Sequence, residues 1–454
     1  MNKSQSWTSG KIVYAVLMSG LLLGYLAVIA FYKDPTITGE TFHFPIYVWI
    51  LRIITAGMAI RLGELWKDKT FLILAAYLLL KLVRVAIPDM NNLFTEPVSD
   101  TLLTGLWVFT ACYGLPRILS KEQLKRFLAV NGSVWTIGMV IYSMLGICAA
   151  WTDQWIWTIG KGSGWGIFTD KRLYLVYYVT SSGSILSISA VMALCGAVLA
   201  KRKTNKLLFI LAMLPIILAL SLTDSRCAQV TLGVGMAAVT GLYLLNKLQH
   251  QKKSVQWLIA LVAAAAVLVI VVISTMKSIS LFNQLKVKGL VISHAQAEET
   301  AGTILSNRGF IGDDPLNQRP ATWNAVLNVL QANPGYLLCG TSILNPMEPV
   351  NASPWVTLQV AHTHCMPLMI LLENGIPGLL LMGVFRTLIA KRTIPQIKKT
   401  GFTLEKAAIA AALSIMAGEL IECFTWLHSG QIPTMPFFFI TLGILAKDTI
   451  STAN

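Results

Sequence analysis

Two histidines, His362 and His364, stand one residue apart in the segment HTHCMPLMILLENGIPGLLLM, directly before an apolar run. Three roles fit this spacing. An imidazole with a pKa of about 6.5 can remove a hydroxyl proton near neutral pH. With Cys365 the pair would make an imperfect zinc-ligand set, because no matching ligand cluster is present elsewhere. Hydrogen bonding within a loop is the third role, and the residues alone favour it for at least one histidine.

Two arginines stand at predicted helix starts. Arg226, in LTDSRCAQV, falls in the first turn of an apolar helix that Asp224 or Ser225 would cap. The residues alone favour a snorkelling arginine paired with Asp224. Arg319 immediately precedes an amphipathic pattern, and a guanidinium beside a helix N-terminus suits phosphate oxygens. A solvated loop arginine is an equal alternative for Arg319.

The amphipathic pattern after Arg319 predicts a short surface helix. Trp323, Val326, Leu327 and Leu330 recur at helical spacing and would form its apolar side. The sequence NPG at 333–335 ends the pattern. We expect this helix to lie on the outer surface, with its apolar side against the membrane domain.

Three glutamates, Glu373, Glu419 and Glu422, fall within apolar runs. Ionisable groups inside a membrane are costly, so they are expected to be functional or paired. Pro377 removes the N–H that would bond the carbonyl of Glu373, which predicts a kink in that helix. The kink could open a cavity near the outer leaflet.

Composition identifies a polytopic membrane protein. The 454 residues are 55% hydrophobic and 13% charged, with a mean hydropathy of +0.64, whereas soluble domains carry about 25% charged residues. The net charge of +15 comes from short basic clusters between apolar runs, which does not favour nucleic-acid binding. Twelve runs approach the length of a membrane span: 12–32, 45–65, 70–87, 99–116, 127–150, 173–200, 206–222, 227–245, 254–275, 366–388, 404–424 and 433–446.

The basic residues predict the orientation. Of the 36 lysines and arginines, 23 fall in one set of alternate connections and 10 in the other, which places both termini in the cytoplasm. The longest connection, 276–365 between spans 9 and 10, then lies outside. We therefore predict an all-α integral membrane protein, one polytopic domain over 1–454, with one large extracytoplasmic loop that contains short amphipathic helices.

Metal and disulfide signals are weak. The seven cysteines form no CxxC pairs, and only Cys227, Cys339 and Cys365 would lie near the outer face, where one bridge is compatible with their positions. The nearest approach to an acidic metal motif, GDDP at 312–315, is better explained as a turn because glycine and proline flank the aspartates. We predict neither a metal nor another cofactor.

Three segments occur in an order that resembles the O-antigen ligase and O-antigen polymerase family of bacterial envelope glycosyltransferases. They are LTDSRCAQV, RPATWNAVLNVLQANPGYLLCG and HTHCMPLMILLENGIPGLLL. The resemblance covers roughly residues 205–390. The family's patterns are matched by Ser225, Arg226, Arg319, Trp323, His362, His364, Glu373 and Gly375. Two departures are Cys365 in place of an asparagine, and Leu338–Gly340 in place of G-x-G.

The resemblance implies transfer of a glycan from an undecaprenyl-pyrophosphate carrier to an acceptor sugar hydroxyl, without a metal, at the outer face of the bacterial inner membrane. The acceptor would be lipid A core or another surface glycan. Arg226 and Arg319 would hold the pyrophosphate. His364, in preference to His362, would deprotonate or orient the acceptor hydroxyl for inverting attack. Arg308 and Glu373 are candidate supporting residues.

Two alternatives stay open on the sequence. A repeat-unit polymerase of the same family would use the same residues: the single large loop favours a ligase, while the spacing of Arg319 and Gly335 resembles that of some polymerases. A twelve-span secondary transporter would use Glu373, Glu419 and Glu422 as ion or proton sites. We detect no repeated halves, and the polar residues gather on one side, which disfavours a transporter.

Overall fold

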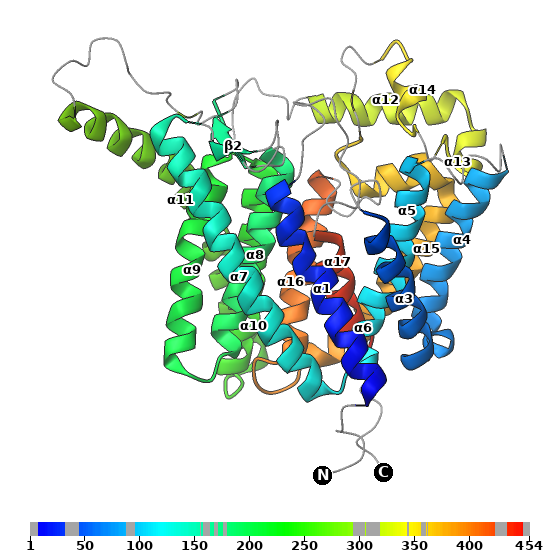
Figure 1. Ribbon diagram of the computed structural model, residues 1–454, viewed down its shortest axis with the longest axis horizontal. Coiled ribbons are helices and arrows are strands. Elements are labelled where there is room, and N and C mark those ends of the chain that lie inside the picture. The colour runs from blue at the N-terminus through cyan, green and yellow to red at the C-terminus, as the bar shows by residue number, and fades with distance from the viewer. Residues whose placement is uncertain are drawn as a thin grey trace.

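The chain folds into a bundle of upright helices with short helices across one end (Figure 1). The computed structural model describes residues 8–31, 45–87, 96–154, 156–157, 164–167, 171–175, 179–293, 305, 318–342, 345–355, 360, 362–422 and 434–447. The end of the bundle covered by α12 (Gln318–Ala332), α13 (Gly335–Cys339) and α14 (Glu348–Asn351) is called the loop face below. The described start of α1 lies at the opposite end.

Each of the twelve predicted spans overlaps a helix in the described residues. Seven helices in the described ranges are long and apolar enough to cross a membrane: α1, α7, α8, α9, α10, α11 and α15. Others are shorter or interrupted, so the count of twelve spans stays a prediction. The helices are α1 (Ser9–Phe31), α3 (Ile46–Leu62), η2 (Leu65–Lys67), α4 (Lys69–Ala86), α5 (Glu96–Trp107), η4 (Val108–Cys112), α6 (Tyr113–Ile118), α7 (Lys121–Thr152), α8 (Val179–Leu199), α9 (Lys203–Leu222), α10 (Arg226–Lys247), α11 (Lys253–Ser293), α15 (Met366–Ile397), α16 (Leu404–Ile421) and α17 (Thr434–Ala446).

Two details of the predicted all-α fold are wrong. A small antiparallel sheet of β1 (Ile156–Trp157), β2 (Gly164–Ile167) and β3 (Leu173–Leu175) follows α7, so the predicted sixth span begins too early. Aromatic and branched side chains favour strands there, and Trp165 of β2 packs on Tyr142 of α7. In addition, α11 continues to Ser293, so the first part of the predicted loop 276–365 is helical.

Helix α16 occupies the middle of the bundle. On one side α7 to α11 stand together, and on the other side α3 to α6 and α15 stand together (Figure 1). Helix α16 contacts α8 and α10 of the first group and α15 of the second, and it also packs against α17. Because it runs toward the loop face, residues at its C-terminal end lie under the loop helices, between the two groups.

Helix α12 forms where the amphipathic pattern predicts it and ends one residue before Asn333. Val326 and Leu330 are buried, as predicted, together with Ala325 and Val329. Leu327, assigned to the same apolar side, is 45% exposed. The buried stripe, which includes Ala325 and Val329, is therefore rotated slightly from the predicted one.

The predicted kink is present in α15, where Gly375 has a left-handed backbone (φ 65°). The break releases carbonyls that the helix cannot bond, and the chain after α13 takes one of them: the Thr341 N–H donates to the Leu372 carbonyl at 2.7 Å. Gly340 also has a positive φ (68°) and packs directly on the backbone of Glu373. This contact between Gly340–Thr341 and Leu372–Gly375, the glycine clasp, joins the loop face to α15.

Replacing Gly375 with alanine should destabilise the protein. Its Cβ would lie 2.7 Å from the carbonyl oxygens of Leu337 and Leu338, and the left-handed backbone alone costs about 1–3 kcal/mol for a residue with a Cβ. Gly383→Ala, in the same helix with nothing within 4 Å of the added Cβ, is the matched control. Thermal unfolding in detergent should show a lower midpoint for Gly375→Ala only, and equal midpoints for the two variants would contradict the clasp.

Candidate functional site

The two histidines lie in residues 362–365, the His loop, which leads into α15. Trp323 of α12 donates its indole N–H to the Thr363 carbonyl at 2.8 Å. The Thr363 side chain is fully buried and donates to the Cys365 carbonyl at 2.7 Å. His364 has a left-handed backbone (φ 52°), which is uncommon for a residue other than glycine. The loop is therefore held in one shape, and Trp323 connects it to the helix that begins with Arg319.

The imidazoles of His362 and His364 are neighbours. Their ring centroids are 4.2 Å apart, and the backbone N–H of His364 donates to Nδ1 of His362 at 3.2 Å. Nδ1 of His362 therefore accepts a hydrogen bond and carries its lone pair there. Both side chains keep partial exposure, 25% for His362 and 31% for His364, so a substrate could reach them.

Glu422 brings the site together from α16. It follows the last residue of that helix, and its side chain is only 5% exposed. Nδ1 of His364 lies 3.0 Å from each carboxylate oxygen. Nδ1 of His362 is 3.4 Å from Oε1, and Nη2 of Arg319 is 3.2 Å from Oε2. A buried carboxylate is tolerated only with such partners.

The contact with Glu422 assigns the tautomer of His364. A carboxylate accepts hydrogen bonds only, so Nδ1 of His364 must carry the ring proton. In the neutral ring, Nε2 then holds the lone pair. This is the arrangement in which a carboxylate orients a histidine that acts as a general base.

The two predicted phosphate-binding arginines lie at helix starts close to Glu422. Arg319 is the second residue of α12, and Arg226 is the first residue of α10. Nη2 of Arg319 is 3.0 Å from Sγ of Cys227, the residue after Arg226. Cys227 also contacts the Ile421 carbonyl, beside Glu422. The N-terminal end of α10, which begins with Arg226, therefore lies beside Arg319 and the end of α16, and a helix N-terminus favours an anionic ligand.

The predicted supporting residues differ in position. Arg308 lies outside the described residues. Glu373 is held away from the histidines by Lys81 of α4, with Oε2 of Glu373 2.6 Å from Nζ and both side chains 1% exposed. Glu373 also precedes Asn374, whose amide donates to the Tyr77 hydroxyl at 3.3 Å. The structure therefore gives Glu373 a place beside the kink of α15, where it supports the glycine clasp.

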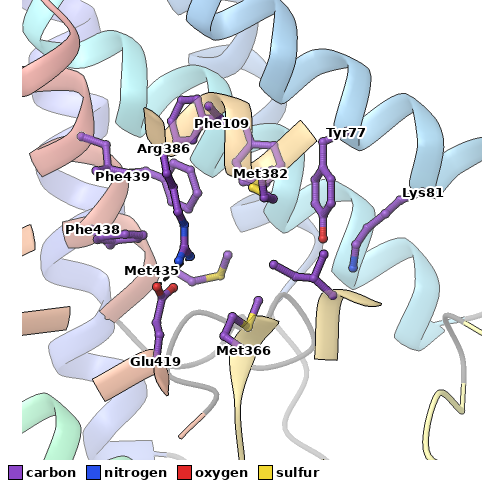
Figure 2. A pocket seen from close by; sticks show the side chains of 13 residues that line it. Tyr77, Lys81, Phe109, Met366, Met382, Arg386, Glu419, Met435, Phe438 and Phe439 are labelled. Carbon is purple, nitrogen blue, oxygen red and sulfur yellow. Dashed lines mark hydrogen bonds and ion pairs between the residues drawn. The ribbon is translucent and has the colours of Figure 1, made fainter. Parts of the chain in front are cut away.

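Glu419, one turn before Glu422, is also paired. Its Oε2 is 2.7 Å from Nη2 of Arg386. The pair lines one side of a small cavity beneath the His loop, and Tyr77 and Lys81 line the other side (Figure 2). The cavity measures about 30 Å³, enough for about two water molecules. All three buried acids that the sequence places in spans therefore have cationic partners.

Sequence reasoning missed the partner of the histidines. It treated Glu422 as an acid within a span, and no spacing rule connects a residue on α16 with His364, 58 positions earlier. The zinc set considered from sequence also changes: Glu422, and not Cys365, has a ligand atom within 4.8 Å of those of His362 and His364. Cys227, Cys339 and Cys365 are all free, so the bridge considered among them is not formed.

The surroundings set the charges of the site. The pKa of His362 is lowered to about 4, chiefly by burial; the charge of Glu422 acts to raise it, and His364 and Arg319 act to lower it. Burial acts to raise the pKa of Glu422, but the hydrogen bond from His364 and the nearby cationic groups lower it overall. At neutral pH the site therefore holds a neutral His362 and an ionised Glu422.

Comparison with known proteins identifies a family. Residues 211–383 match the model of a family described as O-antigen ligase. The match runs from α9 into α15, so it includes Arg226, Arg319, His362 and His364. The resemblance inferred from the three sequence segments is confirmed. No curated protein matches the chain.

The lowered pKa of His362 predicts how stability depends on pH. The unfolded chain binds a proton at this residue near pH 6.5, but the folded protein does so only near pH 4. The contribution of neutral His362 to the free energy of unfolding is therefore fully present above about pH 6.5. It is lost as the pH falls toward 4. The unfolding midpoint of His362→Gln should fall less steeply than that of wild type across this window. The exposed His250 provides the control variant, His250→Gln, and parallel curves for all three proteins would contradict the assignment.

Proposed function

Since residues 211–383 match the model of the O-antigen ligase family, we propose that this protein is a membrane glycosyltransferase of the ligase type. It transfers a glycan from an undecaprenyl-pyrophosphate carrier to a hydroxyl of an acceptor sugar. The observation that carries the proposal is the Glu422 carboxylate, 3.0 Å from Nδ1 of His364. Because this carboxylate keeps the ring proton on Nδ1, Nε2 of His364 has a free lone pair that can accept a hydroxyl proton.

The proposed reaction is an inverting displacement. His364 removes the proton of the acceptor hydroxyl as the oxygen attacks the anomeric carbon of the donor sugar. A carbon–oxygen bond forms on one face of the sugar while the bond to the pyrophosphate oxygen breaks on the other. The bonding electrons leave with the carrier pyrophosphate, and Glu422 stabilises the imidazolium that His364 becomes.

Arg319 and Arg226 are proposed to bind the pyrophosphate. Negative charge grows on the leaving oxygen, and two guanidinium groups at helix N-termini stabilise it. Without donor, Arg319 is oriented by Glu422 and Cys227. The donor therefore meets an arginine that is already positioned, which reduces the entropy lost on binding. These cationic groups take the charge that a metal ion supplies in other transferases, so the reaction is proposed to need none.

The site is proposed to face the extracytoplasmic side of a bacterial inner membrane, with both termini in the cytoplasm. The support is the distribution of lysine and arginine between alternate connections. A lipid-linked donor fits a site at the end of an apolar bundle, since the carrier tail can stay in the membrane while its pyrophosphate meets Arg319. The acceptor is proposed to be a glycolipid or another surface glycan.

The transporter alternative has less support. Intramembrane acids that carry protons or ions need to be released from their partners during transport. Glu373 and Glu419 are each buried with one cation, at 2.6 and 2.7 Å. Glu422 is bound by Arg319 and His364 at the loop face. These pairs are typical of structural roles in a fixed bundle.

Variants of His364 and Glu422 should separate chemistry from binding. His364→Ala should reduce kcat by about 10²- to 10⁴-fold because the general base is lost. Glu422→Gln should also lower kcat while the KM for acceptor changes little, because the histidine loses its orienting acceptor. Arg319→Ala should both raise the KM for the lipid-linked donor and lower kcat, because the pyrophosphate is bound less tightly and its growing charge is less stabilised. The assay is transfer of labelled glycan by purified protein in detergent.

The control is Glu348→Gln, an exposed glutamate on the same loop region, which should leave transfer unchanged. Unfolding midpoints of all variants show whether each one folds. Wild-type transfer by a folded His364→Ala protein would remove this residue from the mechanism.

A glycan profile of cells that lack the gene tests the function itself. Long undecaprenyl-linked chains that fail to reach a surface acceptor are the expected result for a ligase. Lipid carriers that hold a single repeat unit would instead identify a polymerase. An unchanged profile would contradict both.

A further inference from the structure

We infer that His362, His364 and Glu422 form a zinc-binding site, and that the bound ion inhibits the transfer reaction. The inhibition rests on the function proposed above, whereas the binding rests only on the three side chains. Two imidazoles and one carboxylate are a common ligand set for Zn²⁺ when the fourth position is held by water.

The distances suit one ion. With bonds of about 2.0–2.2 Å, neighbouring ligands of a tetrahedral zinc lie about 3.3–3.5 Å apart. Oε1 of Glu422 is 3.4 Å from Nδ1 of His362 and 3.0 Å from Nδ1 of His364. Ligand atoms of all three residues lie within 4.8 Å of one another. Small rotations of the side chains would complete a tetrahedral site, and His362 would exchange the hydrogen bond that its Nδ1 accepts from the His364 backbone N–H for the bond to the ion.

Arg319 does not prevent this binding. A guanidinium beside a metal site would normally weaken it by charge repulsion. Here Arg319 contacts only Oε2, at 3.2 Å, whereas Oε1 lies within 3.4 Å of Nδ1 of both histidines, and Nδ1 of His364 is 3.0 Å from either oxygen. The ion can take Oε1, and Arg319 keeps Oε2. The pair with Arg319 also holds the carboxylate in the orientation that the ion needs, as groups around metal ligands do.

The bound ion would act on the chemistry through the tautomer of His364. A metal on Nδ1 requires the lone pair at that atom, so the proton of the neutral ring must reside on Nε2. Nε2 then donates a hydrogen bond and cannot accept the proton of an acceptor hydroxyl. The ring keeps one proton in both states, so binding at His364 releases none.

The ligand set also predicts which ions bind. Imidazole nitrogen favours Zn²⁺, Co²⁺ and Cu²⁺, whereas Mg²⁺ and Ca²⁺ prefer sites made of oxygen ligands. Zinc should therefore inhibit at concentrations where magnesium has no effect. EDTA should restore the activity of zinc-treated protein and leave untreated protein unchanged.

The test measures binding and activity on the same full-length protein, purified in detergent with any polyhistidine tag removed. Co²⁺ titration of the chelator-treated protein should give one equivalent of the visible absorption of tetrahedral cobalt, and Zn²⁺ should displace it. Glu422→Gln and His362→Gln should each weaken Co²⁺ binding by at least about tenfold. His250→Gln, an exposed histidine far along the chain, is the matched control and should bind like wild type.

The outcomes separate the two proposals. Both proposals are supported if Co²⁺ binding depends on Glu422 and His362 and if Zn²⁺ blocks glycan transfer. If Co²⁺ binds in this way but the protein transfers no glycan, the site holds and the proposed function fails. Transfer that is insensitive to Zn²⁺ in a protein that binds no Co²⁺ would overturn the inference. Equal Co²⁺ binding by folded Glu422→Gln and wild type would overturn it as well.

Discussion

The site depends on one buried carboxylate. Glu422 ends the central helix of the bundle, where an ionised group without partners would cost several kcal/mol. Its partners come from different parts of the chain: Arg319 from α12, and His362 and His364 from the His loop. The contacts that stabilise this charge therefore hold α12 and the His loop against the end of α16. The same contacts that make the burial tolerable also place the side chains in a reactive arrangement.

Around this centre, the chain uses broken helices to put polar groups at the end of an apolar bundle. Pro377 and Gly375 interrupt α15, and the released Leu372 carbonyl bonds Thr341. Lys81 neutralises Glu373 beside the break. The contacts of Leu372 and Glu373 partner polar groups at the interruption, as irregular backbone at membrane depth requires. The result is a rigid platform that holds the His loop from below while Trp323 holds it from above.

Local rules were sufficient for much of this protein, because helix starts, apolar runs and a proline kink are encoded by neighbouring residues. The positions of α12, the break near Pro377 and the helix start at Arg226 follow from them. The link between His364 and Glu422 could not be predicted, since it depends on which helices pack together. The sheet at Trp165 was missed because short aromatic strands resemble the start of an apolar span. Leu327 shows that spacing gives the buried side of a helix only approximately.

The left-handed backbone of His364 has an evolutionary consequence. At this position glycine or asparagine would adopt the same backbone with less strain, so selection for stability alone would remove the histidine. If His364 is the general base proposed above, the chain accepts a less stable loop in exchange for an imidazole at this point. Selection then keeps histidine at residue 364 only while the activity is needed. A duplicate of the gene that is no longer needed for this activity is expected to lose the histidine early.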